Sequence, residues 1–158
     1  MPTRRRLLTA GGSGALLAAL GMDAGAKGYP VAHSDAEWRK LLSPAAYAVL
    51  RHEATERPFT SPLLHEKRKG VFGCAGCRRD LYSSSTKFES GTGWPSFWDV
   101  LPSAVTTSRD RLLGLPRTAV SCAGCGGHLG HVFEDGPKPT GLRYCMNGVA
   151  LTFRPAAA

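Results

Sequence analysis

The chain has 158 residues, of which 42% are hydrophobic, a content that is typical of a globular protein and excludes a disordered one. This length allows one domain with one modest core. The 19 glycines and 11 prolines favour strands and turns over a helix bundle. The net charge of +8 permits contact with nucleic acid but does not require it, and we interpret the basic run over residues 67–69 as a solvated loop.

The first 26 residues have the layout of a twin-arginine signal peptide. Three arginines at positions 4–6 precede an apolar run over residues 10–20, and small residues at 24–26 provide a cleavage site. The apolar run is shorter than the about 20 residues that span a bilayer, so we expect no stable membrane insertion. We therefore predict an exported, periplasmic protein with a signal peptide over residues 1–26 and one domain over residues 27–158. An uncleaved anchor or a disordered tail is the alternative.

Two short helices are predicted at the start of this domain. Ser34 and Glu37 fit a capping box ahead of the first helix. Ser43 and Pro44 supply an N-cap and a first-turn proline for the second. Because a residue before proline disfavours the helical conformation, we expect the helical region to end at Arg57-Pro58.

Short apolar runs separated by turn residues follow from about Val71 onward. They cover residues 71–72, 81–82, 105–107, 118–120, 132–133 and 142–153. This pattern predicts a small antiparallel β domain with the N-terminal helices packed against it.

Four of the five cysteines form two Cys-x-x-Cys pairs with the same internal Ala-Gly, namely Cys74 with Cys77 and Cys122 with Cys125. Each pair turns the backbone so that both sulfurs face one point, and two pairs supply the four thiolates that suit a structural zinc ion. We predict one structural Zn²⁺ per chain at these residues. Two structural disulfides, which an oxidising compartment would allow, and a redox-active dithiol are the alternatives.

The fifth cysteine, Cys145, is a candidate nucleophile. Strand alternation places Arg143, Cys145 and Asn147 on one polar face, and a neighbouring arginine favours a reactive thiolate. The apolar parity changes after Asn147-Gly148, which predicts a bulge or turn there. A buried, inert cysteine is the alternative.

Two further segments carry candidate functional residues. His128 and His131 could perform acid–base chemistry or could be structural, and Asp135 could act with them or could only form a turn. Trp94, on a loop rich in glycine and proline, could cover the core or could form a flat apolar wall for a small alkyl–sulfur substrate.

The stretches SGTGWPSFW and CAGCGGHLGHVFEDGPKPTGLRYCMN, together with the two Cys-x-x-Cys pairs, resemble the B-type peptide methionine sulfoxide reductases, which act on the R epimer of the sulfoxide. The resemblance runs from about Trp38 to Phe153. It implies a mainly β fold of two small antiparallel sheets with N-terminal helices, held by zinc at the two pairs. It also implies a monomer that acts on oxidised proteins or peptides.

The resemblance also assigns roles to individual residues. It implies that Cys145 is the nucleophile, that the acid and substrate-orienting residues are His128, His131, Asp135, Arg143 and Asn147, and that Trp94 and Phe133 form the wall for the substrate methyl group. In this chemistry the Cys145 thiolate attacks the sulfoxide sulfur and becomes a sulfenic acid. His131 supplies the proton to the oxygen, with His128 or Asp135 supporting it through hydrogen bonds.

The chain departs from many of these reductases at Thr92, where they carry a resolving cysteine. We therefore expect an external reductant, thioredoxin-like or another thiol, to reduce the sulfenic acid. Two alternative functions fit the cysteine pairs alone. One is a zinc-dependent binding module, and the other is a general disulfide oxidoreductase. We expect no nucleic-acid partner, because a binding module would leave Cys145 and the Trp94 loop without a role.

Overall fold

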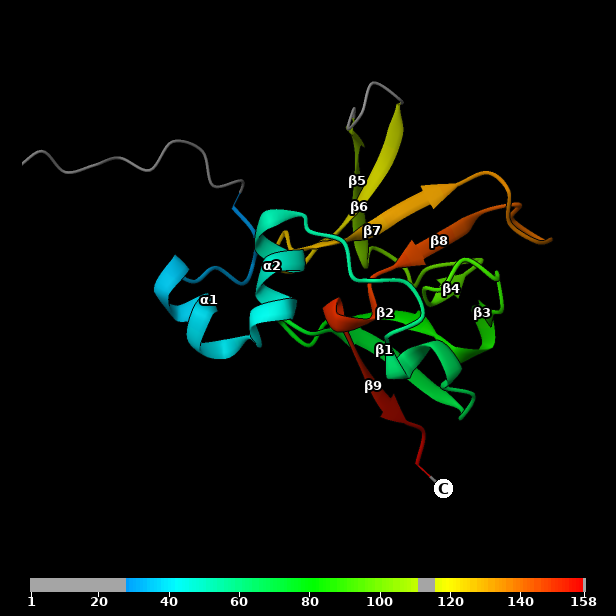
Figure 1. The fold of residues 1–158 in the computed structure, drawn as a ribbon, viewed down its shortest axis with the longest axis horizontal. Coiled ribbons are helices and arrows are strands. Elements are labelled where there is room, and N and C mark those ends of the chain that lie inside the picture. Colours follow the sequence, from blue (N-terminus) through cyan, green and yellow to red (C-terminus); the bar gives the residue numbers. More distant parts are fainter. Residues whose placement is uncertain (1–27, 111–115, 158) are drawn as a thin grey trace, which may run out of the picture.

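The computed structural model describes residues 28–110 and 116–157 (Figure 1). The predicted signal peptide over residues 1–26 lies outside these residues and stays a prediction. Within the described part of the chain, no helix is both long enough and apolar enough to cross a membrane.

The two predicted helices are present as α1 (Asp35–Leu41) and α2 (Pro44–His52). The predicted capping box is confirmed, because the Ser34 hydroxyl accepts the Glu37 backbone N–H while the Glu37 carboxylate accepts the Ser34 backbone N–H. Ser43 caps α2 in the same manner, by accepting a backbone N–H of the first turn. Both helices lie at one end of the molecule, away from β3 and β4 (Figure 1).

The second helix ends earlier than the sequence predicted. Glu53 adopts a left-handed backbone conformation with a φ of 55°, and its N–H bonds to the Ala48 and Val49 carbonyls, so α2 closes at His52 and not at Arg57-Pro58. A single 3₁₀ turn, η1 (Pro62–His65), follows. The segment between α2 and η1 is therefore free to run beside the functional site described below.

The strands form two antiparallel sheets, which confirms the predicted mainly β fold. The three-stranded sheet has the order β2 (Asp80–Ser83), β1 (Gly70–Cys74), β9 (Leu151–Pro155). The six-stranded sheet has the order β3 (Lys87–Phe88), β4 (Ser96–Phe97), β8 (Arg143–Met146), β7 (His128–Phe133), β6 (Arg117–Cys122), β5 (Val105–Asp110). Two 3₁₀ turns, η2 (Ser84–Thr86) and η4 (Gly148–Ala150), connect strands of the two sheets.

Aromatic side chains from both sheets fill the core. Phe72, Tyr82 and Phe97 are fully buried, and the Tyr82 and Phe97 rings stack with their centroids 4.3 Å apart. The β8 side chains Tyr144 and Met146 also point into this core. Because successive side chains of a strand point to opposite faces, this burial turns the residue between them, Cys145, to the other face of the sheet.

The predicted interruption at Asn147-Gly148 is confirmed. The chain leaves β8 at Asn147, makes the η4 turn over Gly148–Ala150 and enters β9 in the other sheet. This turn keeps Asn147 buried beside the end of β8 and explains the change of apolar parity that the sequence shows there.

Candidate functional site

The four paired cysteines gather at the junction of the two sheets. Cys74 ends β1 in one sheet and Cys122 ends β6 in the other, and all four sulfurs lie within 4.8 Å of one another. The separations of 3.7 Å between the sulfurs of Cys74 and Cys125 and of 3.5 Å between those of Cys77 and Cys122 resemble the roughly 3.8 Å edge of a tetrahedron with about 2.3 Å metal–sulfur bonds. They are far from the about 2.05 Å of a disulfide. The sulfurs therefore fit a single metal ion.

The shared Ala-Gly sequence explains how each pair closes around this point. Gly76 donates its backbone N–H to the Cys74 sulfur at 3.4 Å, and Gly124 donates to the Cys122 sulfur at 3.3 Å. A Cβ atom on Gly124 would lie only 2.9 Å from the Cys77 sulfur, so a larger residue would crowd the ligand position. Hydrogen bonds with the neighbouring thiols, that with Cys122 first in each case, lower the pKa of the Cys77 thiol and raise the pKa of the Cys74 thiol, so the four thiols titrate as one coupled group.

Cys145 lies in a second, separate site. The strand register pairs it with His131 on β7 and with Ser96 on β4, so these three side chains share one face of the sheet. A pocket of about 130 Å³ opens on this face. Five of the predicted residues line it: Trp94, His131, Phe133, Cys145 and Asn147.

The pocket walls are held by the segment that follows α2. The Trp94 indole N–H donates to the Glu56 carbonyl at 2.9 Å, and the Asn147 side-chain oxygen accepts the Glu56 backbone N–H at 2.8 Å. The Asn147 amide also donates to the Leu129 carbonyl at 3.0 Å. Two predicted binding residues are thus fixed by a third that the sequence did not single out, and the neighbouring Thr55 adds to the pocket lining.

His128 lies behind the pocket and does not line it. Its side chain is buried, its ring centroid lies 5.3 Å from that of His131, and its Nδ1 atom has no hydrogen-bond partner among the described residues. Burial, helped by the nearby His131, lowers the pKa of His128. A neutral ring is therefore favoured there near pH 7, and no hydrogen bond joins it to His131 within the described part of the structure.

The prediction that Asp135 supports His131 through a hydrogen bond is wrong. Asp135 lies beyond the end of β7 and accepts two hydrogen bonds from Arg143, both 2.8 Å long, which lower the pKa of its carboxyl group. The same guanidinium lies over the Phe133 ring, 4.4 Å from its centroid. Asp135 therefore orients Arg143 and, through it, the Phe133 wall of the pocket.

The partner of His131 is instead Asp110, at the end of β5. The Nε2 atom of His131 lies 2.9 Å from Oδ2 of Asp110, and Arg117 on β6 donates to the same oxygen at 2.8 Å. Arg117 also lines the pocket. The sequence analysis missed both residues because nothing local marks them. Only the pairing of β5 with β6 and of β6 with β7 brings them to His131.

Comparisons with known proteins agree with this geometry. Residues 42–155 match the family model described as the SelR domain. The protein named peptide methionine sulfoxide reductase MsrB of Leifsonia xyli subsp. xyli is 55% identical over 136 residues, which cover 85% of this chain and 98% of that protein. Proteins of the same name from Agrobacterium fabrum (54% identical; 77% of this chain, 91% of that protein) and Methanosarcina barkeri (55%; 78% and 88%) are similar to it.

The chain belongs to the MsrB family. In this MsrB chain the half-buried Cys145 thiol opens into the pocket, and the charged Arg143 interacts with it from the same strand. A thiol, a histidine held by a carboxylate and two aromatic rings thus surround one small cavity. This arrangement suits attack on a small, neutral group that carries an apolar end and an oxygen to be protonated.

Proposed function

We propose that the chain reduces the R epimer of methionine sulfoxide in oxidised proteins and peptides, with Cys145 as the nucleophile. Reduction of peptide methionine sulfoxide accords with its place in the MsrB family. The observation that carries the assignment of residues is the single pocket shared by Cys145, His131 and Trp94. The aromatic wall packs against the methyl group, and the sulfoxide oxygen faces polar side chains.

The reaction in this pocket transfers one oxygen atom. The Cys145 thiolate attacks the sulfoxide sulfur, and His131 gives a proton to the sulfoxide oxygen. The oxygen passes to Cys145 as a sulfenic acid while the sulfoxide sulfur gains two electrons and leaves as methionine. Arg143 stabilises the thiolate before attack, and Asp135 keeps the guanidinium in place.

An external thiol completes the cycle in this proposal. The attacking thiol forms a mixed disulfide with Cys145 and releases water, and a second thiol then restores Cys145 by thiol–disulfide exchange. Thr92 supports this route, because a hydroxyl lies 3.7 Å from the Cys145 sulfur at the position where a resolving cysteine would stand. The remaining four cysteines form the proposed metal site.

The metal at the four-cysteine site is, in our proposal, one structural Zn²⁺ per chain. Four sulfur ligands leave no open position for a substrate, so the ion would join the two sheets and take no part in the reaction. We further propose that the protein acts as a monomer.

Residues 1–26 support a proposal about location. We propose that they direct the folded, metal-loaded protein through the twin-arginine route to the periplasm. Fractionation of cells that express the full chain tests this: replacement of Arg4, Arg5 and Arg6 by Lys is expected to keep the protein in the cytoplasm. A periplasmic protein after that change would refute the route.

A single-turnover assay on the reduced full chain, without added reductant, tests the activity. We expect about one methionine per protein from a peptide with the R epimer, and none from the S epimer. Cys145→Ser is expected to give none from either. If the folded, metal-loaded wild-type protein releases no methionine from either epimer, the proposed function is wrong and a binding module becomes the better explanation.

A further inference from the structure

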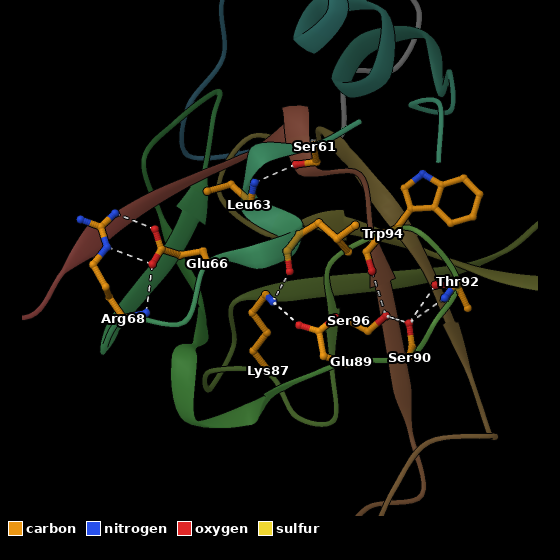
Figure 2. Close-up of polar contacts among 11 residues, drawn as sticks. Ser61, Leu63, Glu66, Arg68, Lys87, Glu89, Ser90, Thr92, Trp94 and Ser96 are labelled. Carbon is orange, nitrogen blue, oxygen red and sulfur yellow. Dashed lines mark hydrogen bonds and ion pairs between the residues drawn. The ribbon is translucent and has the colours of Figure 1, made fainter. Parts of the chain in front are cut away.

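Three hydroxyl groups connect β4 to the Cys145 sulfur. The Ser96 hydroxyl lies 2.7 Å from that of Ser90, which lies 2.8 Å from that of Thr92. The Thr92 hydroxyl lies 3.7 Å from the Cys145 sulfur, within hydrogen-bond reach for sulfur. Figure 2 shows the links from Ser96 on β4 to Ser90 and from Ser90 to Thr92, the last two on the loop between β3 and β4. We refer to these three residues as the hydroxyl chain.

The hydrogen bonds along the hydroxyl chain can run in either of two opposite directions, from Cys145 to Ser96 or from Ser96 to Cys145. Each hydroxyl has one hydrogen to donate and two lone pairs to accept. When Cys145 is a thiol, its S–H can donate to Thr92, Thr92 to Ser90, Ser90 to Ser96, and Ser96 to the Trp94 carbonyl at 3.3 Å. When Cys145 is a thiolate, every donor can turn round, so that Ser96 donates to Ser90, Ser90 to Thr92 and Thr92 to the sulfur. Only the long Ser96–Trp94 hydrogen bond is lost.

Burial supports a role for this arrangement. Ser96 has no solvent exposure, and a buried hydroxyl is costly unless it is hydrogen-bonded. Ser96 also lies directly opposite Cys145 in the strand register, so the hydroxyl chain begins and ends on the same face of the sheet. Successive hydrogen bonds polarise one another in such surroundings, so each bond strengthens the next.

We propose that Thr92 is a catalytic residue of this enzyme, whose hydroxyl donates to the Cys145 thiolate with Ser90 and Ser96 aligned behind it. This inference rests on the proposed function for the identity of the nucleophile. It gives Thr92 a positive role at the position where a resolving cysteine would stand. Ser90 and Ser96 are positioning residues, because they act only through Thr92.

Three charged or titratable groups face the sulfur as well, and one of them, Arg143, also has a side-chain hydrogen bond with Cys145. They are His131 on β7, Arg143 on β8 and Arg117 on β6. Asp135 holds Arg143 with two hydrogen bonds, while Asp110 engages both His131 and Arg117. The described residues of β4 and of the loop over residues 90–94 add no charged group. Thr92 is thus the hydroxyl partner of the sulfur beside the Arg143 guanidinium, and Thr92→Val removes this hydroxyl while it leaves the charged groups in place.

The test compares Thr92→Val, which keeps the shape and removes the hydroxyl, with Thr92→Ser, which keeps the hydroxyl. The rate of Cys145 alkylation by iodoacetamide is measured against pH in the full-length, metal-loaded protein, with mass spectrometry to locate the label. A hydrogen bond to a charged group contributes enough to change the thiolate population roughly tenfold. The midpoint is the pH at which the alkylation rate reaches half its maximum. We therefore expect Thr92→Val to raise this midpoint by about one pH unit, and Thr92→Ser to have a midpoint close to that of the wild-type protein.

Two further variants keep the test decisive. Ser90→Ala breaks the hydroxyl chain but leaves Thr92 in place, so we expect a smaller upward shift than in Thr92→Val. Ser85→Ala removes a hydroxyl from an exposed Ser83–Ser85 pair and is expected to leave the midpoint unchanged. A wild-type midpoint in folded Thr92→Val overturns the proposal. If Thr92→Val does not fold, a wild-type midpoint in Ser90→Ala does so. Alkylation needs no substrate, so these outcomes are distinct from failure of the single-turnover assay.

Discussion

His131 and Asp110 are joined by a 2.9 Å hydrogen bond between Nε2 and Oδ2, although 20 residues of sequence separate them. An ionised carboxylate can only accept, so Nε2 of the imidazole carries a hydrogen and the other ring nitrogen, Nδ1, is the one left to exchange a proton with substrate. Arg117 donates to the same Asp110 oxygen and so fixes the carboxylate. The tautomer and the orientation of the proposed acid therefore depend on a residue two strands away.

We expect Asp110→Asn to lower kcat by about tenfold or more with little change in KM, because the amide can donate to Nε2 and favour the wrong tautomer. Steady-state kinetics with an R-sulfoxide peptide measure this. Asp80→Asn is the matched control, since Asp80 is also held by an arginine but is exposed and lies outside the pocket lining. An unchanged kcat in Asp110→Asn would contradict the assigned role.

Trp94 is expected to determine substrate affinity. Trp94→Ala removes the aromatic wall, and we expect KM to rise on the order of tenfold, as the loss of about 1–2 kcal/mol of apolar contact implies. Trp94→Phe keeps much of the wall but loses the hydrogen bond to the Glu56 carbonyl, so its KM should lie between those of the wild-type protein and of Trp94→Ala. Trp98→Phe changes a tryptophan outside the pocket lining and serves as control. Equal KM values in wild type and Trp94→Ala would show that the wall lies elsewhere.

Metal removal is expected to destabilise the whole domain. Cys77→Ser removes one ligand, and we expect loss of the bound ion and of about 3 kcal/mol or more of unfolding free energy, which lowers Tm by roughly 10 °C. Metal analysis and thermal unfolding measure the two effects. Cys145→Ser removes a thiol outside the metal site and should retain both the ion and the wild-type Tm. One metal ion per chain in Cys77→Ser would argue against the four-cysteine site.

His128 should make stability depend on pH. Burial lowers the pKa of His128 in the folded chain below its ordinary value of 6.5. Between the pKa of the folded chain and that of the unfolded chain, His128 therefore binds a proton in the unfolded chain but not in the folded chain. Stability is therefore fully present above about pH 6.5 and falls as the pH drops through the lowered pKa. His128→Phe, which cannot titrate, should show a flatter dependence of unfolding free energy between pH 7.5 and 5 in urea titrations. The same slope as wild type would mean that other groups cause the dependence.

Exposed His65→Gln is the control for this experiment, because it removes a histidine from the surface at the end of η1. We expect its stability to change with pH as that of the wild-type protein does. A flattened dependence in His65→Gln as well would remove the support for a specific effect of His128.

Local signals explain how much of the fold could be predicted. Ser34 and Ser43 act through neighbours three residues away, and both caps formed as expected. The two Cys-x-x-Cys pairs and the alternation around Cys145 are also short-range patterns. In the structure the four paired sulfurs lie together, and the side chains of β8 alternate between the core and the pocket face. Arg57-Pro58 misled the prediction of the helix end, because the left-handed residue that closes α2 is Glu53, which has no strong preference for that conformation.

The rest of the site depends on contacts between distant strands. Asp110 and Arg117 meet His131 only through the register of β5, β6 and β7. Glu56 reaches Trp94 and Asn147 through backbone groups that every residue possesses, so its identity gave no signal. Asp135 follows His131 closely in sequence, yet its hydrogen-bond partner is Arg143 on β8. Proximity in sequence therefore did not identify the residue that Asp135 contacts in the folded structure.

The place of the four cysteines also has a consequence for the rate at which the protein folds. Cys74 belongs to one sheet and Cys122 to the other, so the ion site exists only after a loop of 44 residues between Cys77 and Cys122 has closed. Closing such a loop costs entropy, and an ion captured at closure offsets that cost. Newly made chains would then reach the native state faster where free metal is plentiful, and scarcity of metal would leave more chains in which the two sheets are not yet joined.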